Sequence, residues 1–310
     1  MYNKYVHYPK NSNECKIHGK EFDIAGMHGC IGSMDGVHVV MEKCEHRLRQ
    51  FHLGPKLKHT SRGYNVTVNH RRRILSCTSG HPARWNDKTL LMYDYFAMSI
   101  MNGELQDHEF ELYENSDTMK KYTGVWIVVD NGYLLWPILM PPVKNTSSRK
   151  AIRWSEWVES MRKDVECTFG ILKGRFRILK TGIRVHGVER CDNIFLTCCA
   201  IHNWFLEIDG RDGTWESSAA WFDSADEVQR HVPFALRRLN NPAAVRMGLG
   251  TPSEETYDVD NMPVRGTHQI NNDTLSTNVL NLDHEEFRKK LITHFDVLFQ
   301  KRKISWPTRK

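Results

Sequence analysis

Val125-Trp126-Ile127-Val128-Val129-Asp130-Asn131-Gly132 is the stretch that decides the fold. Five consecutive apolar residues that end in a turn sequence are typical of a strand buried on both faces, in a sheet that helices cover. In α/β sheets of this kind the functional groups gather at strand ends. We therefore expect a central strand here, with the carboxylate of Asp130 at its end.

Further strands are expected upstream of this stretch. Apolar residues surround Ser33-Met34-Asp35-Gly36 and predict a strand over residues 30–41. Two more predicted strands, 64–68 and 74–79, are separated by a polar turn, which favours a hairpin. We expect a helix over residues 87–101, where most residues that recur at helical spacing are apolar.

Three helices are expected downstream. Ser155 is a candidate N-cap for the first, and an apolar stripe follows at helical spacing: Val158, Met161, Val165, Phe169, Leu172 and Phe176. Glu166 lies beside this stripe, at the margin of the buried face. The second helix is predicted over 188–206, with His202 as an internally hydrogen-bonded core residue, and the third over 285–299.

Composition restricts the class of protein. The chain has 310 residues and a formal net charge of +6, and it has no apolar run near the roughly 18 residues that span a bilayer. We expect no membrane association. Its eight cysteines include no C-x-x-C pair, which favours a reducing compartment. We expect a nuclear protein with a cytoplasmic pool.

Asp35, Asp130 and Glu166 are the acids most able to meet at one end of the predicted sheet. Converging carboxylates repel one another and are tolerated mainly when a cation neutralises them. Carboxylate oxygens suit Mg²⁺ or Mn²⁺, and two such ions can activate a water for attack on a phosphodiester. From spacing alone an alternative stays open, because Asp-Gly and Asp-Asn-Gly are also ordinary turn sequences and the chain has 37 acidic residues.

Three segments resemble, in order, the acidic blocks of the PIF/Harbinger-type DDE transposases, a DDE superfamily endonuclease group with a DDE Tnp4-type domain. They are Gly32-Ser33-Met34-Asp35-Gly36-Val37-His38, Val129-Asp130-Asn131-Gly132-Tyr133 and Arg162 to Phe176. Between Asp130 and Glu166 lie 35 residues, a spacing similar to the DD35E pattern of related integrases and transposases. Cys199-Ala200-Ile201-His202-Asn203 and Ile304-Ser305-Trp306-Pro307 also resemble family segments.

The resemblance implies an α/β, RNase H-like mixed sheet flanked by helices, with a largely irregular C-terminal tail and a closing helix. It implies that Asp35, Asp130 and Glu166 are the catalytic, metal-binding residues, with Mg²⁺ or Mn²⁺ as cofactor and DNA as substrate. Family members carry a His-Asp-Ser-like segment after the third strand; here Asn86-Asp87-Lys88 stands in its place, and Asp87 would match the acid.

We expect four parts: a short N-terminal remnant (1–25), the endonuclease domain (26–209), a flexible linker or tail (210–280), and a C-terminal helix with a basic end (281–310). The family commonly has a helix-turn-helix region before the first acid, and 34 residues precede Asp35 here. We therefore expect DNA targeting to involve a lost upstream region or a separate Myb-like DNA-binding partner. A homo-oligomer is also left open.

A basic stretch surrounds the third acidic block and predicts contacts to DNA phosphates, against the simpler alternative of a solvated helix face. Its candidate nucleic-acid-binding residues are Arg162, Lys163, Lys173, Arg175, Arg177 and Lys180.

Two functions therefore compete with a metal-dependent DNA endonuclease. The first is a catalytically silent, domesticated or truncated transposase derivative that binds DNA or protein. The second is an unrelated metal phosphohydrolase of small substrates, which the basic stretch disfavours.

Overall fold

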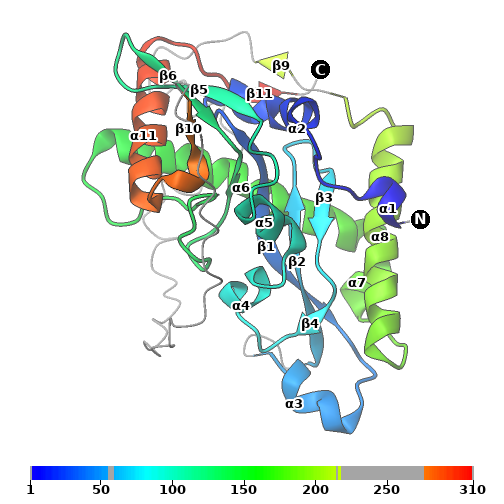
Figure 1. The fold of residues 1–310 in the computed structure, drawn as a ribbon. Coiled ribbons are helices and arrows are strands. Elements are labelled where there is room, and N and C mark those ends of the chain that lie inside the picture. The colour runs from blue at the N-terminus through cyan, green and yellow to red at the C-terminus, as the bar shows by residue number, and fades with distance from the viewer. Residues whose placement is uncertain (1, 55–58, 214–215, 218–275, 309–310) are drawn as a thin grey trace. The chain divides into compact units, whose positions relative to one another are not determined.

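The computed structural model describes residues 2–54, 59–213, 216–217 and 276–308, all within one compact unit. These residues form the predicted α/β fold, with a mixed sheet flanked by helices and a closing helix near the C-terminus (Figure 1). Most of the predicted irregular tail, 210–280, lies outside the described residues.

A mixed sheet forms the centre, and its strands follow the order β3-β2-β1-β7-β8, with β4 also paired to β2. The strands are β1 (Cys30–Val40), β2 (Ser61–Val68), β3 (Ile74–Cys77), β4 (His81–Pro82), β7 (Trp126–Val128) and β8 (Leu139–Met140). Strands β1, β2 and β3 pair antiparallel, whereas β7 runs parallel to both β1 and β8. Three antiparallel strands followed by two parallel ones are the RNase H-like arrangement that the sequence predicts.

The predicted central strand is confirmed, since Val125 to Val129 are fully buried and β7 lies between β1 and β8. The predicted hairpin is also confirmed as β2 and β3, which join through a turn at Asn69. In that turn the N–H of Arg72 donates to the carbonyl of Asn69, and Arg72 takes a positive φ of 72°.

Helices α6 (Arg149–Arg175), α7 (Arg177–Thr181) and α8 (Val188–Ile208) pack against the sheet, and α1 (Tyr2–Tyr5) lies against α8 (Figure 1). Val165 and Leu172 of α6 are buried with Phe195 of α8 in one apolar cluster. The predicted start of α6 was wrong: Ser155 lies inside the helix, where its hydroxyl donates to Ala151 and accepts from the N–H of Val143. A serine inside a helix can satisfy its hydroxyl in this way, so it need not cap.

The helix predicted over 87–101 is two helices, α4 (Asp87–Leu91) and α5 (Tyr95–Met101). Asp94 ends the continuity because its carboxylate accepts from the N–H of Ala97 and caps α5. The fully buried Asp94 also accepts from the side chain of Asn65 on β2, which fixes the break against the sheet. An N-cap residue has non-helical backbone angles, so a continuous helix cannot pass through it.

Residues 1–25, for which the sequence pattern predicted no helix or strand, contain α2 (Ser12–Ile24), a helix that packs on β1. Asn11 caps it by accepting from the N–H of Glu14. Cys15 and Phe22 are fully buried and join the apolar cluster that contains Trp126 of β7. Long-range burial therefore stabilises a helix whose local sequence is mostly polar.

A second sheet, absent from the sequence-based prediction, has the order β10-β6-β5. Its strands are β5 (Glu109–Tyr113), β6 (Met119–Thr123) and β10 (Thr277–Asn278). Helix α11 (His284–Gln300), the predicted closing helix, packs on β5 and on α6 (Figure 1). The remaining elements are short: a 3-10 helix at His46–Leu48, α3 (Arg49–His52), a 3-10 helix at Val279–Asn281, and the paired β9 (Glu216–Ser217) and β11 (Pro307–Thr308).

None of the helices in the described ranges has the length and apolar character that crossing a membrane requires.

Candidate active site

Asp35 lies in the middle of the sheet, on β1 and opposite Val66 of β2. Its Oδ1 accepts a 2.8 Å hydrogen bond from the N–H of the next residue, Gly36. The side chain is 19% exposed, so a solvent-accessible partner can still reach it.

Asp130 comes two residues after the end of β7. Because β7 pairs in parallel with β1, Asp130 lies near Asp35 of β1. Ser33 pairs with Val128 in that register, so each acid follows its paired residue by two positions. The turn fixes Asp130, because the N–H of Gly132 donates to its Oδ1 at 2.7 Å. The first two acids of the predicted set are therefore neighbours across adjacent strands.

The electrostatics of Asp35 reflect this crowding. The pKa of Asp35 is raised to about 7, chiefly by burial, and the nearby carboxylates of Asp130 and Asp87 act in the same direction. The N–H of Gly36 and the guanidinium of Arg162 act in the opposite direction. An acid destabilised in this way gains from a cation placed beside it.

Glu166 reaches the same region from α6, where its carboxylate is 40% exposed. Nη1 of Arg162 lies 2.8 Å from Glu166 Oε1 and 3.8 Å from Asp35 Oδ2. Arg162 also makes two contacts to Glu159, at 2.7 Å and 3.0 Å. The Arg162 guanidinium thus lies between the first and third predicted acids, and a third carboxylate, that of Glu159, holds it there.

Asp87, the first residue of α4, adds a further carboxylate. A Cβ placed on Gly132 would lie 2.9 Å from both Asp87 Oδ2 and Asp130 Oδ1, and one placed on Gly36 would lie 3.0 Å from Asp87 Oδ1. The Asp87 carboxylate therefore fits between the backbones that follow Asp35 and Asp130. A side chain at either glycine would collide with it, so both glycines are needed for this close approach.

The donors fit a hard divalent cation, because they are carboxylates whose mutual repulsion already raises the pKa of Asp35. Within the described ranges, however, no three His, Cys, Asp or Glu side chains lie close enough together to hold a metal ion as they stand. The position of Arg162 explains this spacing, since its guanidinium separates Asp35 from Glu166.

The predicted phosphate-contacting residues do not share one environment. Arg162 is 12% exposed and lies among the acids, while Lys163 is 31% exposed and lies 3.4 Å from Glu166. Lys173 and Arg175 are half-buried at the end of α6, and Arg177 and Lys180 are exposed on α7. The sequence had placed all six on one basic face, and it had no signal that Arg162 turns to the carboxylates.

Comparison with known proteins supports the resemblance on which these residues were chosen. The sequence profile of the DDE superfamily endonuclease family matches residues 34–203, which is more than half of the chain. No solved structure gives a significant match.

The curated relatives are distant. A "Protein ALP1-like" of Arabidopsis thaliana is 24% identical over 209 residues, which cover 66% of this chain and 49% of that protein. The "Putative nuclease HARBI1" of Mus musculus is 23% identical over 217 residues, covering 69% of this chain and 56% of that protein. Its Xenopus laevis counterpart is 31% identical over 138 residues, covering 42% and 39%. The chain spans about half the length of the curated relatives it matches.

Asp35, Asp130 and Glu166 all fall inside the matched range, on β1, two residues after β7 and on α6. The sequence-based prediction of the family is confirmed: the chain belongs to the DDE superfamily endonuclease family.

Proposed function

We propose that this protein is a metal-dependent DNA endonuclease or transposase of Harbinger type, which cleaves phosphodiester bonds through Asp35, Asp130 and Glu166. The observation that best supports the proposal is that Asp35 has Asp130 as a neighbour and shares a contact to Arg162 with Glu166. Asp130 raises the pKa of Asp35, and Asp35 and Glu166 contact the same nitrogen of Arg162.

Each residue has a distinct role in this proposal. Asp35 is held rigidly by the sheet and by the N–H of Gly36, and Asp130 by the N–H of Gly132, so both carboxylates are oriented before any ligand arrives. Glu166 is 40% exposed and can turn on α6 towards a ligand. Bound Mg²⁺ or Mn²⁺ would supply the activated water and the charge stabilisation that phosphodiester cleavage requires.

Arg162 controls whether these acids are free to bind a cation. Its guanidinium neutralises Asp35 and Glu166 in the present arrangement. Because Glu159 already holds Arg162 through two contacts, the guanidinium can release Glu166 and stay paired. We propose that metal binding takes this route.

The choice of DNA as substrate rests on charge. Lys173 is half-buried at the end of α6, Arg177 and Lys180 are exposed on α7, and solvent-accessible cations of this kind bind nucleic acid through its phosphates. The relatives named as putative nucleases agree with this choice. As part of the same proposal, the protein acts in the nucleus, and a separate Myb-like protein or a second copy of this chain contributes to the choice of DNA site.

The test is nicking of supercoiled plasmid DNA by the purified chain, with Mg²⁺ or Mn²⁺ and with EDTA. Asp130→Asn should abolish nicking because it removes one of the carboxylate charges. Asp107→Asn is the matched control, since it makes the same change at an exposed position in the turn before β5. Metal-dependent nicking by Asp130→Asn at the wild-type rate would contradict the assignment.

One observation favours the second candidate, a catalytically silent derivative that binds DNA or protein. Arg162 already pairs with Glu166 and lies 3.8 Å from Asp35, so part of the negative charge of the site is compensated without a metal. Salt-sensitive DNA binding without nicking under any metal condition would support this alternative. Turnover of a generic phosphate ester in place of DNA would instead support a small-substrate phosphohydrolase.

A further inference from the structure

A second site lies on the other flank of α6. A cavity of about 340 Å³ is lined by Arg71, Arg72, Ile171, Arg175, His202, Leu206 and Arg211. Its volume falls within the roughly 300–1,000 Å³ of small-molecule sites. Four of the seven lining residues are arginines, and none is acidic.

The cavity is separate from the carboxylates described above. Arg175 follows Glu166 by nine positions on α6, about two and a half helical turns, so the two side chains leave opposite sides of the helix. Residues Arg71 and Arg72 come from the turn between β2 and β3, and His202 comes from α8. Three elements therefore build a basic pocket away from Asp35.

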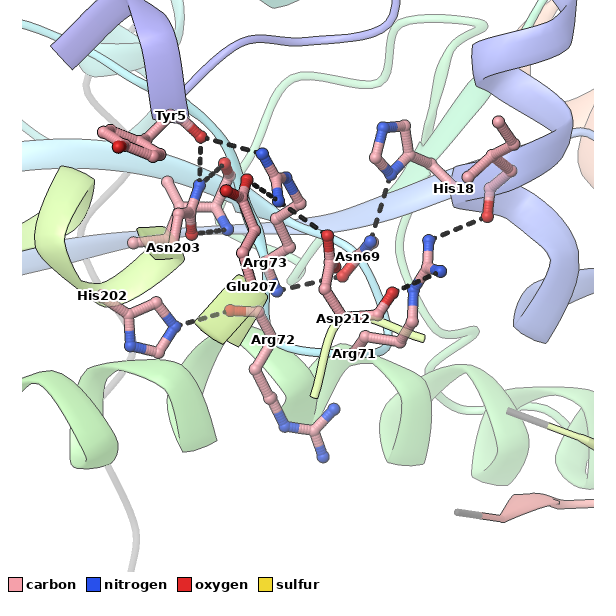
Figure 2. A network of polar contacts seen from close by, with 12 residues as sticks. Tyr5, His18, Asn69, Arg71, Arg72, Arg73, His202, Asn203, Glu207 and Asp212 are labelled. Carbon is pink, nitrogen blue, oxygen red and sulfur yellow. Dashed lines mark hydrogen bonds and ion pairs between the residues drawn. The ribbon is translucent and has the colours of Figure 1, made fainter. Parts of the chain in front are cut away.

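The turn that carries Arg71 and Arg72 is tightly held. The Arg71 guanidinium donates to the carbonyls of Ile17 and Asp212 and is 3% exposed, so it is fixed in place. Arg72 keeps a positive φ of 72°, which is unfavourable for a residue with a side chain. Figure 2 shows its guanidinium pointing away from the hydrogen-bond network around Arg73 and Asn203.

His202 positions two of the arginines. Its Nε2–H donates to the carbonyl of Arg72 at 2.8 Å, as Figure 2 shows, which leaves Nδ1 to accept from Arg175 at 3.4 Å. The pKa of His202 is lowered to about 4, chiefly by burial, and Arg175 acts in the same direction. The imidazole is therefore neutral at pH 7, and the charge of the pocket comes from its arginines alone.

The arginines of the pocket are incompletely neutralised. Arg71 lies 3.7 Å from the buried carboxylate of Glu21 and Arg72 lies 2.7 Å from that of Asp164, but Arg175 lies 4.0 Å from its nearest acid, Asp209. Arg211 makes no ion pair with any part of the chain that the structure describes. Guanidinium groups that share a cavity repel one another, and an anion placed among them relieves that repulsion.

We propose that this pocket binds a phosphate group. Arginine presents paired N–H donors that match two phosphate oxygens at once, and clusters of arginine recognise phosphate in proteins generally. The phosphate belongs either to a free anion such as pyrophosphate or to the backbone of DNA. Neither source depends on the carboxylate site being active.

The test uses the full chain and two matched pairs of variants. Ile171→Glu puts a carboxylate at the wall of the pocket, whereas Ile178→Glu makes the same change on α7, outside it. The two isoleucines are almost equally exposed, 37% and 38%, so both variants should fold. Arg211→Gln and Arg47→Gln form the second pair, because Arg47 is an exposed arginine far from the pocket lining.

In the first arm, calorimetry measures the binding of pyrophosphate, with chloride at matched ionic strength as the control anion. We expect saturable binding that weakens roughly tenfold or more in Ile171→Glu and Arg211→Gln and is unchanged in the two controls. In the second arm, binding of a short DNA duplex is measured across a salt series. If a backbone phosphate lies in the pocket, the salt slope falls by about one in Ile171→Glu and in Arg211→Gln and is unchanged in Arg47→Gln.

If the pocket variants change pyrophosphate binding but not the salt slope of DNA binding, the pocket binds a free phosphate. If they change the salt slope, the pocket binds the DNA backbone. The proposal would be overturned if Ile178→Glu weakened pyrophosphate binding as much as Ile171→Glu does. It would also be overturned if pyrophosphate did not bind and the salt slope did not change. Plasmid nicking is a separate readout, so loss of the proposed nuclease activity would leave this result intact.

Discussion

Nη1 of Arg162 lies 2.8 Å from Oε1 of Glu166, and this ion pair places a protein cation beside a carboxylate for which we propose a metal-binding role. The same nitrogen lies 3.8 Å from Asp35. In the proposed function the arginine and a divalent ion therefore compete for the same two acids. Four predictions follow from this contact and from other contacts in the fold.

Replacing Arg162 with Gln should destabilise the metal-free protein and strengthen its response to metal. Without the guanidinium the acids repel one another, and Tm in EDTA should fall by about 2–4 °C for each kcal/mol lost. The rise in Tm on adding Mn²⁺ should then exceed that of the wild type, because no cation competes.

The matched control for this change is Arg153→Gln, which removes an arginine from the same helix that pairs with Asp296 at 3.1 Å. It should leave the Mn²⁺-induced rise in Tm as it is in the wild type. An Arg162→Gln protein whose Mn²⁺ response is no larger than that of the control would show that Arg162 does not compete with metal.

Asp87→Asn should slow plasmid nicking by at least about tenfold, equivalent to about 1.4 kcal/mol in the barrier. The reason is that its carboxylate lies against the turns that follow Asp35 and Asp130, and it contributes to the charge that attracts a cation. Initial nicking rates at a fixed Mn²⁺ concentration give the measurement, with Asp107→Asn as the control. A wild-type rate in Asp87→Asn would remove this residue from the site.

Asp192→Asn should lower the free energy of unfolding by about 3–5 kcal/mol, the usual cost of breaking a buried ion pair. Asp192 accepts from Arg62 at 2.6 Å and from the hydroxyl of Tyr64 at 2.8 Å, with side-chain exposures of 9% for Arg62 and 15% for Asp192. Urea unfolding measures the change. Glu45→Gln, which breaks the exposed pair with Arg47, should cost less than about 1 kcal/mol.

His294→Asn should flatten the dependence of stability on pH. Burial, with a smaller effect of His28, lowers the pKa of His294 to about 2, and its Nδ1 accepts from the N–H of Tyr113. The folded state thus keeps this histidine neutral, and the unfolded state takes up a proton as pH falls below about 6.5. Its contribution to stability is present above that pH and is lost on acidification.

For this one residue, linkage gives a loss on the order of 2 kcal/mol between pH 7 and pH 5. The amide oxygen of Asn can still accept from Tyr113 but does not titrate, so the variant should lose less stability over that range. Urea unfolding at the two pH values is the measurement. An equal loss in wild type and variant would mean that His294 is protonated in the folded state.

The sequence predicted the parts of the fold that depend on local composition. The apolar run ending at Asp130 is the central strand β7, and the helical stripe around Val165 is the buried face of α6. Both patterns follow from burial and periodicity, which a single sequence displays directly. The choice of Asp35, Asp130 and Glu166 among the acidic residues came from the family resemblance.

What the sequence missed depends on contacts between distant residues. The break between α4 and α5 comes from Asp94, whose carboxylate meets Asn65 across 29 residues of chain. Helix α2 is stable because Phe22 is buried beside β7, although its own residues are mostly polar. In the sequence, Arg162 is one of several basic residues and was therefore predicted to contact phosphate. Only the three-dimensional arrangement shows that it faces two acids.

Strand β10 pairs with β6, and α11 packs on α6 and β5, so the C-terminal residues are bound to the rest of the fold by non-covalent contacts. Residues 276–308 are joined to the rest of the described fold through backbone hydrogen bonds and buried apolar side chains such as Phe287 and Phe295. The peptide bonds between residues 217 and 276 are therefore not the only connection between the two parts. A chain cut once in that interval would yield two fragments that copurify under native conditions and separate only in denaturant.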